Sequence, residues 1–158
     1  MTARADRPQD GTMWLELALP SLPASAEIGR VAVAVLAGGL QFTLGEIEQL
    51  KLAVTEAIGN CVLHAYPDGP GRLVVRARLE TGGTIVTEVQ DWGMGIADVA
   101  QARQPAFTTS LDPDHIGLGF EIMEQFTDAL EVESAPGDGT LVRMRKKPAA
   151  SGDAAERL

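Results

Sequence analysis

The segment from Thr43 to Cys61 constrains the fold of this chain more than any other stretch. Its apolar residues recur at helical spacing and form one continuous stripe, with polar residues on the opposite side. Thr43 is placed to cap the start of a helix, and Glu46, three residues later, completes a capping box. A helix with one strongly apolar side needs a core beneath it, so we expect a packed globular fold. The stripe consists of Ile47, Leu50, Val54, Ile58 and Cys61.

Composition agrees with a single globular domain. The chain has 158 residues, of which 45% are hydrophobic and 22% charged, and a chain of this length builds one substantial core. We expect a flexible arm over residues 1–11, a folded domain over 12–147 and a flexible tail over 148–158. The net charge of -9 argues against direct nucleic-acid binding and against attachment to anionic membranes, because both need a basic surface.

The sequence also bears on location and on metal chemistry. No apolar run approaches the roughly 20 residues that span a bilayer, and the first residues lack an apolar signal core, so we expect a cytoplasmic protein. A single cysteine, Cys61, excludes an internal disulfide, and two histidines are too few for a zinc site. A bound metal would be a hard ion held largely by oxygen atoms.

The pattern before Thr43 predicts one strand and one helix. Alternating apolar residues predict a strand from Trp14 to Pro20. Helical spacing after Pro23 predicts a helix that ends at Gly38, and we expect its apolar stripe to pack on a sheet. That stripe consists of Ile28, Val31, Ala32, Val35 and Leu36.

The pattern after Cys61 predicts two pairs of strands. Residues 72–80 and 84–91 are joined by a glycine-containing turn that is typical of a hairpin, and residues 130–134 and 140–145 flank a second turn. The segment between the pairs predicts a long loop with a short helix, followed by a helix from about Gly117 to Ala129. We therefore predict an α+β two-layer sandwich with helices on one face of a mixed, mostly antiparallel sheet.

Three short motifs indicate a binding site. Glu56 and Asn60 lie one helical turn apart, Asp91-x-Gly93-x-Gly95 follows a strand, and Gly117-Leu118-Gly119-Phe120 opens a helix. Taken alone, the first pair is compatible with a solvated helix face and the second motif with an ordinary turn. Neither GxxxxGK[ST] nor GxGxxG occurs, so the common P-loop and dinucleotide motifs are excluded.

The chemistry of these motifs suits a nucleotide. A carboxylate at a strand end can accept a hydrogen bond from a purine amine, and glycines let the backbone approach the ligand closely. The N–H groups at a helix start favour a phosphate. A carboxamide oxygen can bind Mg²⁺, and a carboxylate one turn earlier can take a proton from a nucleophile, which suits phosphoryl transfer.

In this order the three motifs resemble the ATPase superfamily shared by DNA gyrase, histidine kinases and mismatch-repair ATPases. Within it, the chain is most similar to the anti-sigma-factor serine kinases, in particular the sporulation anti-sigma factors. The similar stretches are residues 55–66, 102–109 and 117–128, within a likeness from about Trp14 to Lys146. The resemblance implies the histidine-kinase-like ATPase fold and a site for ATP and Mg²⁺.

The resemblance also implies roles for individual residues. Glu56 corresponds to the catalytic general base, and Asn60 to a Mg²⁺ ligand that also contacts the nucleotide. The family's adenine pocket corresponds to Asp91, Gly93, Gly95 and Thr140, of which Asp91 reads the base. The lid over the phosphates corresponds to Thr108, Thr109, Gly117, Leu118, Gly119 and Phe120.

By the same resemblance, the chain is an enzyme with two kinds of protein partner. The family implies phosphorylation of a serine on an anti-sigma-factor antagonist, sequestration of an RNA polymerase sigma factor, and a homodimer. Arg30 stands where the family has an arginine that meets both partners, with a solvated surface residue as the alternative.

One position departs from the family pattern. Close relatives carry an arginine two residues before the first lid glycine, where this chain has His115. A histidine is a weaker partner for a γ-phosphate, and Lys51 and Arg103 are alternative contacts. Two other hypotheses stay open: a nucleotide-gated binding module without effective phosphotransfer, and a detached histidine-kinase ATPase domain, although no helix with a phosphoacceptor histidine precedes the motifs.

Overall fold

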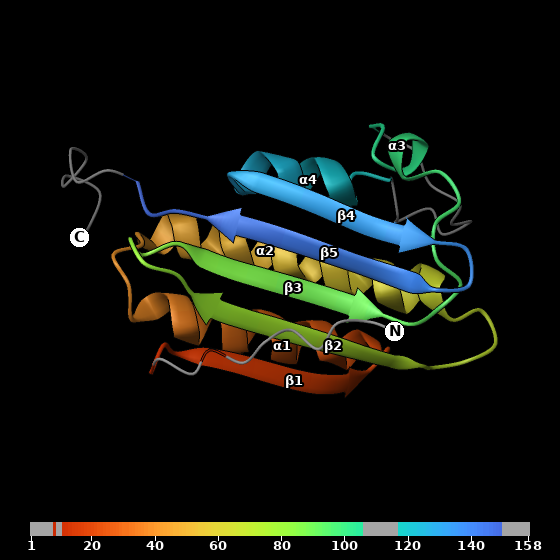
Figure 1. Cartoon of the computed structure of the whole chain (residues 1–158), viewed down its shortest axis with the longest axis horizontal. Helices are drawn as coiled ribbons and strands as arrows, with labels where there is room; N and C mark the ends of the chain where they lie inside the picture. Colours follow the sequence, from red (N-terminus) through yellow and green to blue (C-terminus); the bar gives the residue numbers. More distant parts are fainter. Residues whose placement is uncertain (1–7, 9–10, 106–116, 150–158) are drawn as a thin grey trace.

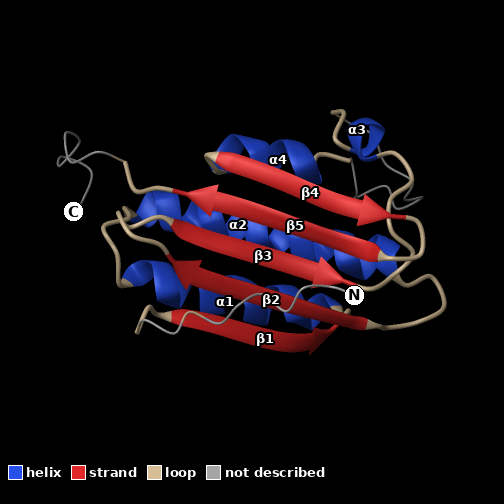
Figure 2. Cartoon of the chain, viewed as in Figure 1, coloured by secondary structure: helices blue, strands red, loops and turns tan. Residues whose placement is uncertain are grey.

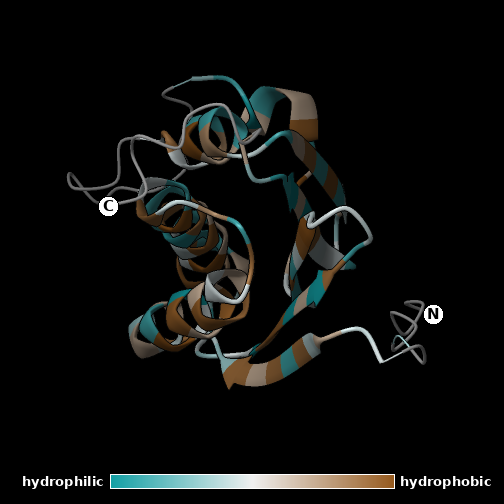
Figure 3. Ribbon diagram, turned by 90° about the vertical axis from the view of Figure 1, so that its left-hand side faces the viewer, coloured by the Kyte–Doolittle hydropathy of each residue, from teal (hydrophilic) through white to brown (hydrophobic). Residues whose placement is uncertain are grey.

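The computed structural model describes residue 8 and residues 11–105 and 117–149. The predicted arm and tail fall largely outside these residues. Within them, the chain forms a sheet layer and a helix layer, seen face on in Figure 1 and edge on in Figure 3. The predicted α+β two-layer sandwich is confirmed.

The sheet has five strands in the order β1-β2-β3-β5-β4. All four neighbouring pairs are antiparallel, so the sheet described here contains none of the parallel pairing that a mixed sheet would have. The predicted hairpin between β2 and β3 and the second pair, β4 and β5, are confirmed. The strands are β1 (Trp14–Pro20), β2 (Arg72–Leu79), β3 (Ile85–Asp91), β4 (Ala129–Ala135) and β5 (Gly139–Lys146).

The helices lie on one face of this sheet (Figure 2). Two long helices run side by side behind the strands, and two shorter ones lie near β4 (Figure 1). A single π-helical turn, η1, continues directly from the end of α2. The helices are α1 (Pro23–Gly38), α2 (Leu44–Asn60), η1 (Cys61–Ala65), α3 (Val99–Ala102) and α4 (Gly119–Phe126). Helix α4 begins within the predicted Gly117–Phe120 segment and ends three residues earlier than predicted.

Helix α2 forms the centre of the helix layer, as predicted. Its capping box is present: the Thr43 hydroxyl accepts from the Glu46 N–H at 3.2 Å, and the Glu46 carboxylate accepts from the Thr43 N–H at 2.7 Å. Four of the five predicted stripe residues are buried in the core, and Ile47 packs against it. The core side of α2 faces the sheet, so the side that carries Glu56 and Asn60 is left for other contacts.

The predicted packing of α1 is wrong. Val35 is 74% exposed, Ile28 50% and Val31 49%, so most of the expected stripe faces away from the sheet. The side of α1 that is buried instead carries several small residues, and a Cβ on Gly29 would lie 2.4 Å from Cδ1 of Ile58 on α2. Small residues let the two helices approach closely. Because residues such as glycine and serine are not apolar positions, the spacing of apolar residues does not reveal that this side is buried. The buried residues of α1 are Ser25, Gly29, Val33, Leu36 and Ala37.

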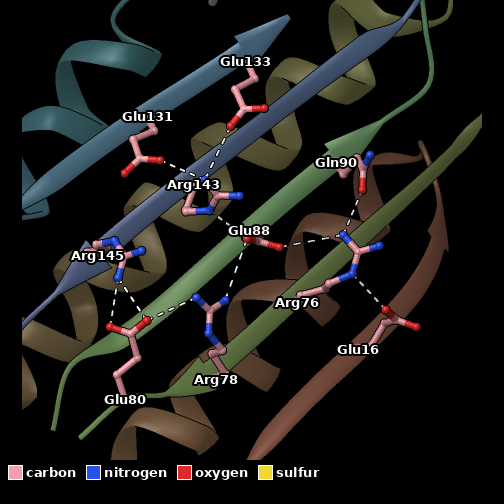
Figure 4. Close-up of polar contacts among 10 residues, drawn as sticks. All are labelled: Glu16, Arg76, Arg78, Glu80, Glu88, Gln90, Glu131, Glu133, Arg143 and Arg145. Carbon is pink, nitrogen blue, oxygen red and sulfur yellow. Dashed lines mark hydrogen bonds and ion pairs between the residues drawn. The ribbon is translucent and has the colours of Figure 1, made fainter. Parts of the chain in front are cut away.

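The face of the sheet opposite the helices carries charged residues in register. One row crosses all five strands with alternating sign: Glu16, Arg76, Glu88, Arg143 and Glu131. Glu88, at the centre of the row and only 4% exposed, accepts from Arg143 at 2.8 Å and lies within 4 Å of Arg76 and Arg78 (Figure 4). We call the five residues that cross the strands, from Glu16 to Glu131, the charged row. Because neighbours have opposite charges, the row stabilises the strand register from edge to edge.

None of the helices in the described part of the chain combines the length and the apolar character that a transmembrane helix requires.

Candidate functional site

Helix α2 and the start of α4 bring together the first and third motifs. A Cβ atom placed on Gly119 would lie 3.2 Å from Oε2 of Glu56 and 3.3 Å from Oδ1 of Asn60. The backbone at the start of α4 therefore lies against both polar side chains, with no intervening side chain. The carboxylate, the carboxamide and the first turn of a helix thus share one place, although Gly119 lies 59 positions after Asn60 in the sequence.

The second motif holds a buried carboxylate at the end of β3. Asp91 is 4% exposed. Its Oδ1 atom accepts from the Gly93 N–H at 2.9 Å and from the Thr140 N–H at 3.2 Å, and its Oδ2 atom accepts from the Cys61 thiol at 3.3 Å. Asp91 is therefore fixed by partners from three segments: the start of η1, the loop after β3, and β5.

Burial controls the electrostatics around this carboxylate. Desolvation raises the pKa of Asp91, while its hydrogen bonds from Gly93, Cys61 and Thr140 act in the opposite direction because they favour the ionised form. Desolvation, followed by the charge of Asp91, raises the pKa of the Cys61 thiol well above its ordinary value. Cys61 thus stays protonated at neutral pH and acts as a donor.

Three glycines let the backbone close around Asp91. A Cβ on Gly93 would lie 2.1 Å from the Ala65 carbonyl oxygen, and a Cβ on Gly95 would lie 2.0 Å from that of Ala135. A Cβ on Gly139 would lie 2.2 Å from the carbonyl oxygen of Asp91 itself. No side chain fits at these positions, so the glycine requirement of the second motif has a direct steric cause.

Gly95 and Gly139 also have left-handed backbones, with φ of +72° and +80°. A hydroxyl group ties the two loops together: Ser134 accepts from the Ile96 N–H at 2.8 Å and bonds to the Gly139 carbonyl oxygen at 2.9 Å. The same hydroxyl lies 2.9 Å from the Thr140 hydroxyl. The turn between β4 and β5 is thereby held against the loop that follows Asp91.

At the start of α4, the predicted glycine segment forms the helix entry. Gly117 has a φ of +71°, a conformation that favours glycine. Leu118 is the N-cap residue, Gly119 begins the helix, and Phe120 packs into the core. The backbone N–H groups of a first helical turn have no partner four residues earlier in the helix, so they are available to an anion.

Of the other predicted site residues, three cannot be placed, and those that are described make other contacts. Thr108, Thr109 and His115 lie outside the described residues. Arg30 lies on α1, where it pairs with Glu27 on the same helix. Of the alternative phosphate contacts, Lys51 bonds to Glu48 at 2.7 Å, and Arg103 pairs with Glu124 on α4. The indole of Trp92 lies 4.8 Å below the guanidinium of Arg72.

Sequence reasoning missed several residues around Asp91. Cys61 was interpreted only as part of an apolar stripe, Ala65 receives a hydrogen bond from Met94 at 2.8 Å, and Ser134 joins two loops. The cysteine follows Asn60 directly, but nothing in the sequence pattern relates it to an aspartate 30 residues later. A π-helical turn such as η1 has no clear sequence signal either, although such turns recur at functional sites.

The side chains present fit a Mg²⁺ ion that is held mainly by the phosphates of a bound nucleotide and by water. The described residues contain no group of three or more His, Cys, Asp or Glu side chains able to hold a metal on their own. Asn60 offers one neutral oxygen beside the small Gly119, and Mg²⁺ is commonly held by one or two protein oxygens together with phosphates and water. The donor set thus suits an ion that arrives with phosphates.

Comparisons with known proteins agree with this geometry. A family model described as a histidine kinase-like ATPase domain matches residues 19–146. The anti-sigma F factor of Thermoanaerobacter sp. (strain X514) is 44% identical over 135 residues, which are 85% of this chain and 94% of that protein. The chain belongs to the anti-sigma F factor branch of the histidine kinase-like ATPase family. The anti-sigma F factor of Caldanaerobacter subterraneus subsp. tengcongensis is 46% identical over 132 residues, which are 84% of this chain and 92% of that protein.

Solved structures of histidine kinases share the fold. A mycobacterial sensor histidine kinase, MprB, aligns with a TM-score of 0.55 at 19% identity, over 85% of this chain and 99% of that one. The histidine kinase domain of the blue-light activated kinase EL346 from Erythrobacter litoralis aligns with a TM-score of 0.51 at 20% identity. That alignment covers 81% of this chain and 61% of the other, so the chain spans about three fifths of the Erythrobacter domain. The resemblance inferred from the motifs is confirmed at the level of family and fold.

Proposed function

We propose that this chain is an anti-sigma factor and a serine-protein kinase, which uses Mg-ATP to phosphorylate a serine of a small antagonist protein. One observation carries the proposal: Gly119 at the start of α4 lies against Glu56 and Asn60 of α2. A base, a metal ligand and a phosphate-binding helix start are the parts that phosphoryl transfer needs. The curated relatives named anti-sigma F factor support the choice of a sigma factor of RNA polymerase as second partner.

In this proposal Glu56 accepts the proton of the attacking serine hydroxyl, and Asn60 holds the magnesium ion. Bound Mg²⁺ would neutralise charge on the phosphates. Asp91 accepts a hydrogen bond from the adenine amine, and Gly93, Gly95 and Thr140 form the pocket around it. The segment over the phosphates comprises Thr108, Thr109, His115, Gly117, Leu118, Gly119 and Phe120.

We further propose that α1 carries the partner-binding surface. Its outer side exposes Ile28, Val31 and Val35, and Arg30 lies on the same helix. Strand β1 is an edge of the sheet, and an exposed strand edge next to apolar side chains suits a second copy of the chain. We therefore propose a homodimer, and we place the site for sigma factor and antagonist on this side of the molecule. The protein would act in the cytoplasm.

A second candidate function is a nucleotide-gated binding module without effective phosphotransfer. It is favoured by His115 at the position of the family's arginine. The structure adds that Lys51 and Arg103, the alternative cations, are each paired with a glutamate. In this function, ATP changes the affinity for a partner and no phosphate is transferred.

Mass spectrometry distinguishes the two functions. A candidate antagonist encoded beside this protein is incubated with the full chain and Mg-ATP, and its mass is followed over time. We expect an added phosphate on a serine, and a rate about 100-fold lower with Glu56→Gln, because general base catalysis contributes on that order. Glu48→Gln is the matched control: it lies on the same helix, is exposed and bonds to Lys51, and it should transfer phosphate normally.

The outcomes separate the hypotheses. Absence of phosphate, although Mg-ATP and the antagonist both bind, overturns the kinase and supports the binding module. Transfer that survives Glu56→Gln overturns the role of Glu56 as base.

A further inference from the structure

The Asp91 carboxylate has most of its acceptor capacity occupied by the protein. An ionised carboxylate offers about four lone-pair positions. Oδ1 receives two backbone N–H groups, from Gly93 and Thr140, and Oδ2 receives the Cys61 thiol. Counting only partners in the described part of the chain, one acceptor position remains, and it belongs to Oδ2.

The Cys61 thiol has two possible acceptors, and the geometry favours the carboxylate. Its Sγ atom lies 3.3 Å from Oδ2 of Asp91 and 3.5 Å from the carbonyl oxygen of Ala57. That carbonyl oxygen already accepts from the backbone N–H of Cys61. A carboxylate is also the stronger acceptor, because hydrogen bonds to charged groups are shorter and stronger. The single thiol proton is thus directed at Asp91.

We propose that Cys61 is a positioning residue for base recognition: its thiol fixes Oδ2 of Asp91 so that the remaining acceptor position meets the exocyclic amine of a purine. This inference rests on the proposed function, in which Asp91 reads the base. The backbone donors hold only Oδ1. The thiol holds Oδ2 as well, so both oxygens resist rotation of the carboxylate about its Cβ–Cγ bond.

The environment of Cys61 keeps the thiol in this role. The side chain is only 5% exposed, so water competes little for the thiol proton. The donor stays directed at Asp91, 3.3 Å away. The ligand recognised in this way is a 6-aminopurine nucleotide, because an amine donates to Oδ2, whereas a carbonyl oxygen at the same position would oppose it.

A comparison of two nucleotides isolates the effect of the thiol from any change in packing. Dissociation constants are measured for Mg-ATP and for the triphosphate of purine riboside, which lacks the 6-amino group. The proteins compared are the wild type, Cys61→Ala and Cys61→Ser, all as full chains. Serine keeps a donor of similar size, whereas alanine removes it.

We expect Cys61→Ala to weaken ATP binding by about threefold to tenfold, as for loss of one net hydrogen bond, and to change binding of the purine analogue less than twofold. Cys61→Ser should retain the wild-type preference for ATP. The inference is overturned if Cys61→Ala weakens the binding of both nucleotides equally, or changes the binding of neither. In that case, a wild type that still prefers ATP to the purine analogue leaves base reading by Asp91 intact. A wild type that binds both nucleotides equally overturns base reading by Asp91, and the inference with it.

Discussion

Gly119 on α4 and Glu56 on α2 leave little space for a side chain between them, since a Cβ atom on Gly119 would lie 3.2 Å from the carboxylate oxygen Oε2. The same atom would lie 3.3 Å and 3.5 Å from the carboxamide of Asn60. The entry of α4 thus depends on a glycine for the placement of both side chains.

The first prediction follows from this contact. Gly119→Ala should weaken Mg-ATP binding on the order of tenfold, because Glu56 and Asn60 must move by a few tenths of an ångström and misplaced groups lose much of their effect. Isothermal titration with Mg-ATP measures the loss. The matched control is Gly59→Ala, next to Asn60, where a Cβ meets nothing within 4 Å; it should bind normally and gain stability. Equal affinity of the two variants would contradict the prediction.

The second prediction concerns the turn between β4 and β5. Gly139→Ala should lower the free energy of unfolding by about 3 kcal/mol, because its left-handed backbone is strained for alanine and its Cβ would lie 2.2 Å from the Asp91 carbonyl oxygen. Gly137→Ala in the same turn has a similar φ of +82° and no atom within 4 Å, so it should cost about 1 kcal/mol. Urea unfolding of both variants tests the difference, and similar losses would show that the close approach is unimportant.

The third prediction concerns the charged row. Glu88→Gln should lower the free energy of unfolding by about 2 kcal/mol, since it removes the buried negative charge that Arg143, Arg76 and Arg78 share. Glu131→Gln is the control: its side chain is 51% exposed and pairs with the same Arg143, so the loss should stay below about 1 kcal/mol. Urea unfolding at low salt measures both. A larger effect at Glu131 would be inconsistent with the buried position of Glu88.

The fourth prediction concerns pH. Burial raises the folded-state pKa of Asp91 above its ordinary value of 3.8, so between these two pKa values the folded protein binds more protons than the unfolded chain. The contribution of Asp91 to stability is therefore full below pH 3.8 and is lost as pH rises through the folded-state pKa. Relative to Asp91→Asn, which cannot titrate, the wild type should be more stable at about pH 4 than at about pH 7.

Urea unfolding of the two proteins across this pH range gives the difference directly. A difference that grows with rising pH would mean that the hydrogen bonds from Gly93, Cys61 and Thr140 outweigh burial.

The sequence predicts the sheet and the central helix well because strong local signals agree with the tertiary packing. The capping box at Thr43 and Glu46 fixes the start of α2, and the glycine turn at residues 81–83 fixes the hairpin. In α1 the local signal fails. Its residues 31–37 are all apolar, so several faces look equally suited to a core, and the choice is made by Gly29, whose missing side chain admits Ile58.

The candidate site likewise combines residues that a local sequence pattern predicts with contacts that only tertiary packing determines. Glu56 and Asn60 are predictable because a helix places residues four apart on one side. Their contact with Gly119 follows only from the motif order and the family resemblance, since no local rule relates the two segments. The Cys61–Asp91 and Ser134–Gly139 hydrogen bonds join segments through tertiary packing, and a single sequence carries no pattern for such pairs.

The charged row restricts the directions from which another protein can approach. An incoming apolar surface would have to strip water from charged groups that already satisfy one another and would gain little in return. Docking is therefore directed to the helical side and the two sheet edges. If a sigma factor and an antagonist both bind within that limited area, they exclude one another sterically. Competition between the two partners would then follow from the fold itself.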